Sequence, residues 1–118
     1  MELFDLTGHV SIVTGGNRGI GFGLARGLVR AGASVAIWAR DLERADEAVE
    51  RLGDLGNGEA IAVACDVTDE RSVIDALAAT VDQLGKVDSA FANAGVSTGV
   101  AFPEMELGEL EHVLAVGI

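Results

Sequence analysis

Apolar residues in this chain gather into four short runs that recur at nearly even intervals. The runs cover residues 10–13, 35–38, 61–64 and 87–91, so their first positions lie 25, 26 and 26 residues apart. Short apolar runs rich in β-branched residues predict buried strands. The sequences between the runs differ from one another, which indicates successive strand–helix units and argues against a solenoid of true repeats.

Helical spacing of apolar residues fills the segments between these predicted strands. Asp41 is the predicted N-cap of the second helix, and Thr68 is expected to open the third, with two acidic residues in its first turn. Gly32, Gly56-Asn57-Gly58 and Gly85 predict where the three helices stop. The expected buried faces consist of Ile20, Leu24, Leu28 and Ala31, then Leu42, Ala45, Val49 and Leu52, then Val73, Leu77, Val81 and Leu84.

Alternation of strands with helices of this length predicts an α/β fold. Parallel strands joined by right-handed helical crossovers give a sheet covered on both faces, and a doubly wound sheet of about four strands is the simplest arrangement. Residues 93–105 read as a loop, and residues 106–116 return to helical spacing. We expect residues 1–118 to form one domain, a partial one, with no linker and no second domain.

A glycine-rich segment follows the first predicted strand and opens the first predicted helix, with the spacing Thr14-Gly15-x-x-x-Gly19-x-Gly21. In such a turn the first glycine allows the tight bend and the second lets the main chain approach a diphosphate. The third lets the helix pack close to the strand. Free N–H groups and a partial positive charge at the start of a helix favour an anion. The segment therefore predicts a site for the pyrophosphate of a dinucleotide.

The end of the second strand is where such sites contact the adenosine ribose, about 20 residues beyond the glycine turn. An acidic residue there favours NAD, but this strand ends in Ala39 and Arg40. A guanidinium suits the 2′-phosphate of NADP, and Arg18 in the glycine turn can approach from the other side. Asp41 is better explained as a helix cap. We expect NADP, with NAD as the alternative and a solvated loop charge as the other reading of Arg40.

The ends of the third and fourth strands carry two further candidate sites. Asp66 follows the third strand, where its carboxylate can accept a hydrogen bond from the adenine amino group while Val67 packs against the ring; a helix-entry role is compatible. Cys65 is expected to be buried and unreactive. At the end of the fourth strand, Asn93-Ala94-Gly95 offers small residues that let the backbone approach a ligand, although alone it reads as an ordinary turn.

Charge and composition narrow the range of partners. The formal net charge of −11 argues against nucleic acid, and residues 1–40 carry +2 while the rest carry −13, so the positive charge lies near the proposed phosphate site. His9, His112 and Cys65 have no metal-binding spacing. No stretch approaches the ~20 apolar residues needed to cross a bilayer. A single cysteine and an acidic start indicate a cytoplasmic protein without a secretory signal.

Together these features resemble the short-chain dehydrogenase/reductase family, which has a Rossmann-type fold. The resemblance covers essentially the whole chain and corresponds to the family's N-terminal half; it rests on the glycine motif, Asp66 and Asn93-Ala94-Gly95 in the family's order. It implies hydride transfer between a nicotinamide cofactor and a carbonyl or alcohol. It also implies a cofactor groove lined by Gly15, Asn17, Arg18, Ile20, Arg40, Asp66, Val67, Asn93, Ala94 and Gly95.

The chain also departs from the family's pattern. Ala92 replaces the first residue of the usual Asn pair, Gly117 stands where the family's catalytic Asn is expected, and the sequence contains no tyrosine. The family's Ser, Tyr and Lys would lie beyond Ile118. We therefore expect residues 1–118 on their own to show no turnover. The alternatives are a non-catalytic module that binds a nucleotide or pairs through an open edge of the fourth strand, and an inactive remnant.

Overall fold

Four parallel strands and three helices alternate along the chain in a computed structural model that describes residues 5–15, 19–53, 55–56 and 58–92. The elements run in the order β1 (Val10–Thr14), α1 (Gly19–Arg30), β2 (Ser34–Ala39), α2 (Leu42–Leu52), β3 (Ala60–Ala64), α3 (Glu70–Leu84) and β4 (Ser89–Ala92). The strand order is β3-β2-β1-β4, so the chain steps outward from β1 to β3 and then crosses to the other side of β1.

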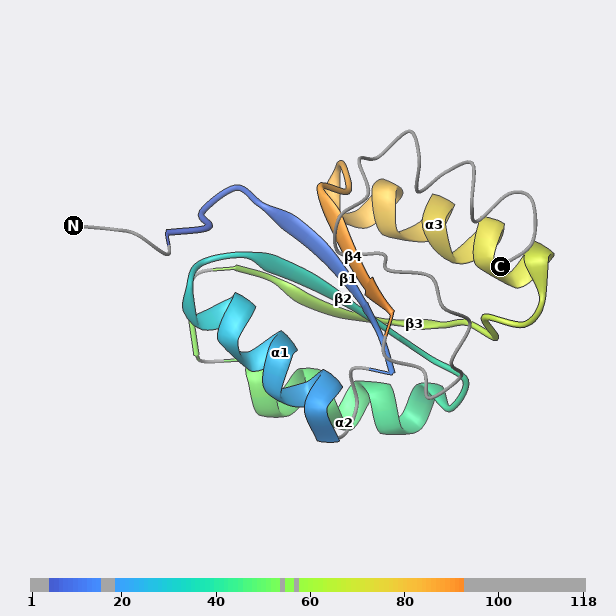
Figure 1. Cartoon of the computed structure of the whole chain (residues 1–118), viewed down its shortest axis with the longest axis horizontal. Helices are drawn as coiled ribbons and strands as arrows, with labels where there is room; N and C mark the ends of the chain where they lie inside the picture. Colours follow the sequence, from blue (N-terminus) through green and yellow to red (C-terminus); the bar gives the residue numbers. More distant parts are fainter. Residues whose placement is uncertain (1–4, 16–18, 54, 57, 93–118) are drawn as a thin grey trace.

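The helices cover both faces of this sheet. Figure 1 shows α1 and α2 together on one face and α3 on the opposite face. Because β1 pairs in parallel with both β2 and β4, the carboxyl ends of the strands meet at one edge of the sheet. The α/β class and the doubly wound parallel sheet predicted from the apolar runs are confirmed.

Alternation of side chains along the strands gives the sheet an apolar core on each face. On the α3 face, Ile12 and Trp38 pack with the buried side of that helix. On the other face, Val13 and Ile37 pack against α1 and α2. Strands covered on both sides must be apolar at nearly every position, which explains why the four runs stood out in the sequence.

The buried faces of the helices differ from the predicted ones. Ile20 is 83% exposed and Val81 is 40% exposed, although both were assigned to buried faces. The residues that face the sheet include several small ones, which let each helix approach the strands, while leucines flank the contact. The buried positions are Gly21, Phe22, Ala25 and Val29 in α1, Ala45, Ala48 and Leu52 in α2, and Val73, Ala76 and Thr80 in α3.

Helix ends follow the capping residues, with two corrections. Asp41 is the N-cap of α2 as predicted, and its side chain accepts from the N–H of Arg44. The third helix is capped by Asp69 and not opened by Thr68, because the Asp69 carboxylate accepts from two N–H groups of the first turn. The second helix ends at Leu52 with Gly53 as its C-cap, before the glycines predicted to stop it. Gly85, with φ 88°, closes α3 as expected.

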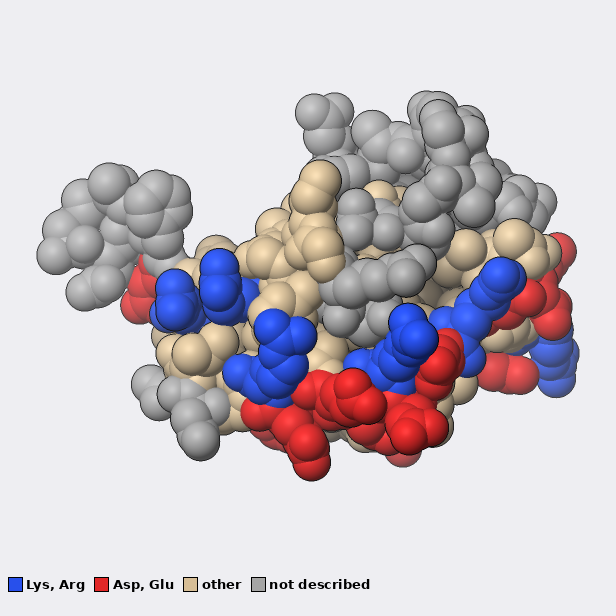
Figure 2. Space-filling model, turned by 90° about the horizontal axis from the view of Figure 1, so that it is seen from below, with Lys and Arg blue, Asp and Glu red and all other residues tan. Residues whose placement is uncertain are grey.

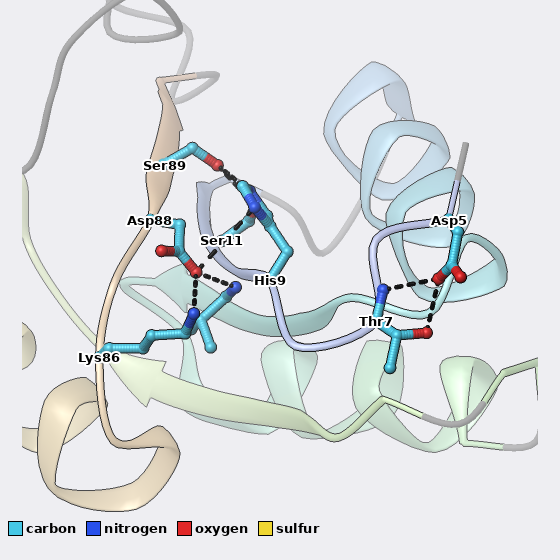
Figure 3. Close-up of polar contacts among 8 residues, drawn as sticks. Asp5, Thr7, His9, Ser11, Lys86, Asp88 and Ser89 are labelled. Carbon is cyan, nitrogen blue, oxygen red and sulfur yellow. Dashed lines mark hydrogen bonds and ion pairs between the residues drawn. The ribbon is translucent and has the colours of Figure 1, made fainter. Parts of the chain in front are cut away.

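The fourth strand begins two residues later than predicted. At its entry the N–H of Asp88 donates to the Val10 carbonyl, and the Asp88 carboxylate accepts from the N–H of Val10, both at 2.8 Å. The side chain thus takes the place of a backbone acceptor where the ladder starts. Figure 3 shows His9, Ser11 and Ser89 beside this contact, with Lys86 at 3.0 Å from the same carboxylate oxygen.

Candidate cofactor site

The carboxyl ends of β1, β2 and β3 bring the predicted site residues to one edge of the sheet. The order β3-β2-β1-β4 places a topological switch beside β1, because the crossovers leave that strand in opposite directions. Open α/β sheets bind ligands in the crevice at such a switch point. The candidate site therefore lies where β1 ends and α1 begins.

The glycines of the turn have the backbone geometry that a tight phosphate loop needs. Gly15 has φ 66° and its N–H donates to the Trp38 carbonyl at 2.8 Å, so the bend starts directly at the edge of the sheet. Gly19 has φ 61°, a conformation that side chains rarely adopt. A Cβ at Gly19 would meet nothing within 4 Å among the described atoms.

The start of α1 differs electrostatically from those of the other two helices. Its first turn holds no acidic residue, whereas α2 and α3 each carry an Asp cap and a glutamate in the first turn. The partial positive charge of the α1 start is thus left without a carboxylate among the described residues. Gly21 is buried and Ile20 is exposed at the start of α1; the packing role of Gly21 stays a prediction.

Arg40 and Asp66 lie next to each other at the ends of neighbouring strands. The N–H of Cys65 donates to the Ala39 carbonyl at 2.9 Å, so the residues that follow leave the sheet side by side. Hydrogen bonds from the Thr68 hydroxyl and then the Thr68 N–H hold the pKa of Asp66 below its usual value, with a smaller contribution from the Arg40 charge. A cation and an ionised carboxylate thus lie near each other at the carboxyl ends of β2 and β3.

The neighbouring Asp41 serves the helix. Its Oδ1 accepts from the N–H of Arg44 at 3.2 Å, and its Oδ2 lies 3.4 Å from Nε of the same arginine. Both oxygens are therefore occupied by α2. This supports the interpretation of Asp41 as a cap. Arg40 is then the charged side chain at the end of β2 that bears on the choice between NAD and NADP.

The residues before and after Asp66 in the sequence lie wholly or partly in the hydrophobic core. Cys65 is 4% exposed, so its expected burial is confirmed, and this burial raises the pKa of its thiol to about 11; its lack of reactivity stays a prediction. Val67 is half-buried and packs against the cluster on the α3 face. Its predicted contact with the adenine ring remains a prediction.

The sequence predicted that Thr68 opens the third helix, but in the structure this residue binds Asp66 instead. Its N–H and its hydroxyl both donate to Oδ1 of Asp66, at 2.9 and 2.6 Å. The available signal was the spacing Asp-x-Thr, which is typical of a local turn in which a carboxylate accepts from the residue two positions on. The same spacing at Asp5 and Thr7 forms the same turn.

Several predicted site residues lie outside the described part of the chain. They are Asn17, Arg18, Asn93, Ala94 and Gly95. Within the described residues, no three His, Cys, Asp or Glu side chains come together as metal ligands. No helix in that same part has the length and apolar character needed to span a bilayer.

Charged side chains are mixed over the face formed by α1 and α2. Figure 2 views the molecule from this side and shows arginines interspersed with carboxylates. The residues of α2 alternate in the same way, with Glu43, Arg44, Asp46, Glu47, Glu50 and Arg51 along one short helix. On the described residues of this face, basic and acidic side chains are thus mixed, and the absence of a nucleic-acid partner stays a prediction from the net charge of −11.

Comparison with known proteins decides the family. A family profile described as short chain dehydrogenase matches residues 9–118. The chain belongs to this family. Gluconate 5-dehydrogenase of Gluconobacter oxydans (strain 621H) is 35% identical over 117 residues, which are 99% of this chain and 45% of that enzyme. The chain therefore spans less than half the length of this relative.

Two solved structures that share the fold contain nicotinamide cofactors. The Pseudomonas aeruginosa RhlG/NADP active-site complex matches with a TM-score of 0.71 and 38% identity, over 81% of this chain and 38% of that one. The 3-ketoacyl-(acyl-carrier-protein) reductase from Brucella melitensis complexed with NADH matches with a TM-score of 0.66 and 36% identity, over 72% and 33%. Relatives at the same level of identity were thus crystallised with different cofactors.

Proposed function

We propose that this chain is the NADP(H)-binding N-terminal part of a short-chain oxidoreductase that interconverts a carbonyl and an alcohol. Membership of the short chain dehydrogenase family supports a nicotinamide-dependent oxidoreductase. The preference for NADP over NAD rests on this chain's own residues. Arg40 carries that preference, because this arginine follows β2 and no acidic residue stands at the end of the strand to bind the ribose hydroxyls.

The described residues suit the cofactor at three places. The positive φ angles of Gly15 and Gly19 suit a tight phosphate turn, and the start of α1 offers N–H groups to a diphosphate. Arg40 offers a bidentate donor to a 2′-phosphate. Asp66 offers an ionised acceptor to the base. We further propose that Asn17, Arg18, Ile20, Gly21, Val67, Asn93, Ala94 and Gly95 complete the groove.

The bound cofactor would supply the hydride, and a protein side chain must supply the proton. The 118 residues contain no tyrosine, the family's proton donor. We therefore expect this polypeptide alone to bind the dinucleotide without consuming a carbonyl substrate. The cytoplasmic location remains a prediction.

The cofactor preference can be tested through Trp38, the only tryptophan. This side chain is 2% exposed, so a change in its emission on titration reports energy transfer to the reduced nicotinamide more than a change in solvent contact. NADPH should quench the emission at lower concentration than NADH. Arg40→Ala should weaken NADPH binding by tenfold or more and leave NADH binding unchanged, since a hydrogen bond to a charged group contributes roughly 1.5–3 kcal/mol.

Arg30→Ala is the matched control, because this exposed arginine lies in the last turn of α1, away from the glycine turn. Removal of its charge should leave both affinities as they were. Equal affinities for NADPH and NADH that do not change in Arg40→Ala would overturn the NADP assignment. An emission unaffected by either dinucleotide would overturn cofactor binding itself.

A second candidate function concerns the edge of β4. This strand stands at the end of the order β3-β2-β1-β4, and within the described residues it pairs only with β1. Unpaired backbone groups along an edge can accept another strand. On this alternative, the chain is a non-catalytic module that pairs with a second polypeptide or with itself. Loss of concentration-dependent association after a proline is placed at Phe91 would support that reading.

A further inference from the structure

Asp66 is held at four points by residues around the start of α3. Its Oδ1 accepts from the N–H and the hydroxyl of Thr68 at 2.9 and 2.6 Å. Its own N–H donates to Ser72 Oγ at 2.9 Å, and its carbonyl accepts from the N–H of Asp69 at 3.0 Å. Within the described part of the chain, Oδ2 takes part in no hydrogen bond. One carboxylate oxygen is therefore fixed and the other is available.

The helix does not need these hydroxyl groups for its own start. Asp69 caps α3 by accepting from the N–H groups of Arg71 and Ser72. Thr68 precedes the cap, and the Ser72 hydroxyl is directed to the backbone of Asp66 instead of to a turn of the helix. The two hydroxyls thus act on Asp66, at the edge of the sheet where Arg40 also lies.

We propose that Thr68 and Ser72 are positioning residues that hold the Asp66 carboxylate as a selector for the adenine base. The inference rests on the proposed dinucleotide binding and adds to it a preference for adenine over a base with a keto oxygen in place of the amino group. Thr68 fixes Oδ1, Ser72 fixes the backbone, and Oδ2 is left to accept from the exocyclic amino group.

The selectivity follows from the donor and acceptor pattern of the two bases. Adenine presents an amino donor, which an ionised carboxylate oxygen accepts well; hypoxanthine presents a keto oxygen, which the carboxylate repels. An acceptor that is already oriented loses less freedom on binding. The Thr68 hydroxyl and then the Thr68 N–H lower the pKa of Asp66, so the acceptor stays ionised well into the acid range.

The chain contains a duplicate of this turn that serves as an internal control. Thr7 donates to Oδ1 of Asp5 through its N–H at 2.9 Å and its hydroxyl at 2.6 Å, the same contacts as at Thr68. Figure 3 shows this turn before β1, apart from the carboxylate of Asp88. The hydroxyl of Thr7 likewise comes first among the causes that lower the pKa of Asp5. Thr7→Val and Thr68→Val therefore remove the same hydroxyl contact at different places and keep the backbone N–H that donates beside it.

The first measurement compares NADPH with its hypoxanthine analogue by quenching of Trp38. The parent protein should bind NADPH about tenfold more tightly than the analogue, the ratio expected for one hydrogen bond to a charged acceptor. Thr68→Val should lose most of this ratio, and Thr68→Ser should restore it. Ser72→Ala should reduce it as well, whereas Thr7→Val should leave it unchanged. Far-UV circular dichroism checks that each variant is folded.

The second measurement needs no cofactor. Carbon-13 NMR of the Asp66 carboxyl should give a pKa that rises towards its usual value in Thr68→Val and returns in Thr68→Ser. In Thr7→Val only the pKa of Asp5 should rise. This readout separates the orientation of the carboxylate from the general stability of the protein. If Thr68 were merely structural, its substitution would change the stability without moving the pKa of Asp66.

The outcomes distinguish the two levels of the argument. Binding of NADPH with an unchanged base preference in Thr68→Val would overturn the positioning role and leave the proposed function intact. The same holds if the parent protein does not prefer adenine. If neither dinucleotide binds to any variant, the proposed function fails and the base selection fails with it.

Discussion

Trp38 and Thr80 join the central sheet to α3 through one buried hydrogen bond. The indole Nε1–H donates to Thr80 Oγ1 at 3.0 Å, and the Thr80 hydroxyl donates to the Ala76 carbonyl at 2.8 Å. An indole nitrogen can only donate, so once buried it needs an acceptor. This requirement explains a threonine in the middle of a helix, where its intrinsic propensity is low.

Thr80→Val should therefore destabilise the protein by about 1–3 kcal/mol, because it leaves the Trp38 N–H without an acceptor in a dry environment. Chemical denaturation followed by circular dichroism measures the change. The same substitution made in a Trp38→Phe background should cost much less, since no indole remains to be satisfied. Equal costs in both backgrounds would show that the contact contributes nothing of its own.

At the scale of single residues, the sequence identified several site candidates but did not show how each one is held. Arg40 and Asp66 were named from their places after two strands, and their proximity depends on the parallel pairing of β2 with β3 in the folded sheet. Thr68 was assigned to helix capping because a threonine before acidic residues is typical of a cap. The structure gives that role to Asp69 and turns Thr68 to Asp66.

At the scale of elements, the pairing of β4 with β1 begins at the Asp88 carboxylate. Burial of Asp88 opposes its ionisation, but the hydrogen bonds from Val10 and Lys86 and the charges of Lys86 and His9 outweigh it and keep its pKa below the usual value. A carboxyl whose pKa is depressed by folding stabilises the folded state above its unfolded value of 3.8. That contribution is lost as the pH falls through the lower, folded value.

Asp88→Asn should accordingly lower the melting temperature at pH 7, since the amide keeps an oxygen acceptor but loses the charge that attracts Lys86. The gap between the variant and the parent should shrink as the pH is taken below 3.8. Asp82→Asn, at an exposed acidic residue of α3, provides the comparison and should show no such convergence. A gap that stays constant over the acid range would contradict a role for the Asp88 charge.

The helices show which part of element structure the sequence carried. Their existence, order and approximate length followed from periodicity and from the caps at Asp41 and Gly85. The predicted buried faces were partly wrong because large apolar residues were taken to mark the contact, whereas alanines such as Ala25 and Ala48 are buried in the core that these helices share with the sheet. How closely a helix approaches a sheet is decided by packing and is not visible in the period alone.

At the scale of the whole molecule, the segment between α2 and β3 packs directly against the connection from α1 to β2. A Cβ at Gly56 would lie 2.0 Å from the Val29 carbonyl oxygen, and one at Gly58 would lie 1.9 Å from the Ala33 carbonyl oxygen. Backbone hydrogen bonding continues this contact, with the N–H of Val35 donating to Glu59 at 2.8 Å. The glycines read from the sequence as a helix stop serve this close approach instead.

Gly58→Ala should destabilise the protein by about 3 kcal/mol, because the atom that the new methyl group meets belongs to the backbone and cannot rotate away. Gly27→Ala is the matched change at an exposed helical position, where a Cβ meets nothing within 4 Å. It should stabilise the protein by about 0.5–1 kcal/mol through the lower entropy of the unfolded chain. Denaturant titrations of both variants test the contrast, and a neutral Gly58→Ala would exclude the tight contact.

The sequence by itself determined the alternation of strands and helices, the glycine turn after the first strand and the residue types at the strand ends. These features are local or periodic, so they can be read one segment at a time. Only the tertiary structure decided which alanines are buried against the sheet, that Gly56 and Gly58 permit a backbone contact, and that Arg40 lies near Asp66. Such relations depend on distances between segments far apart in the chain, and packing in three dimensions sets those distances.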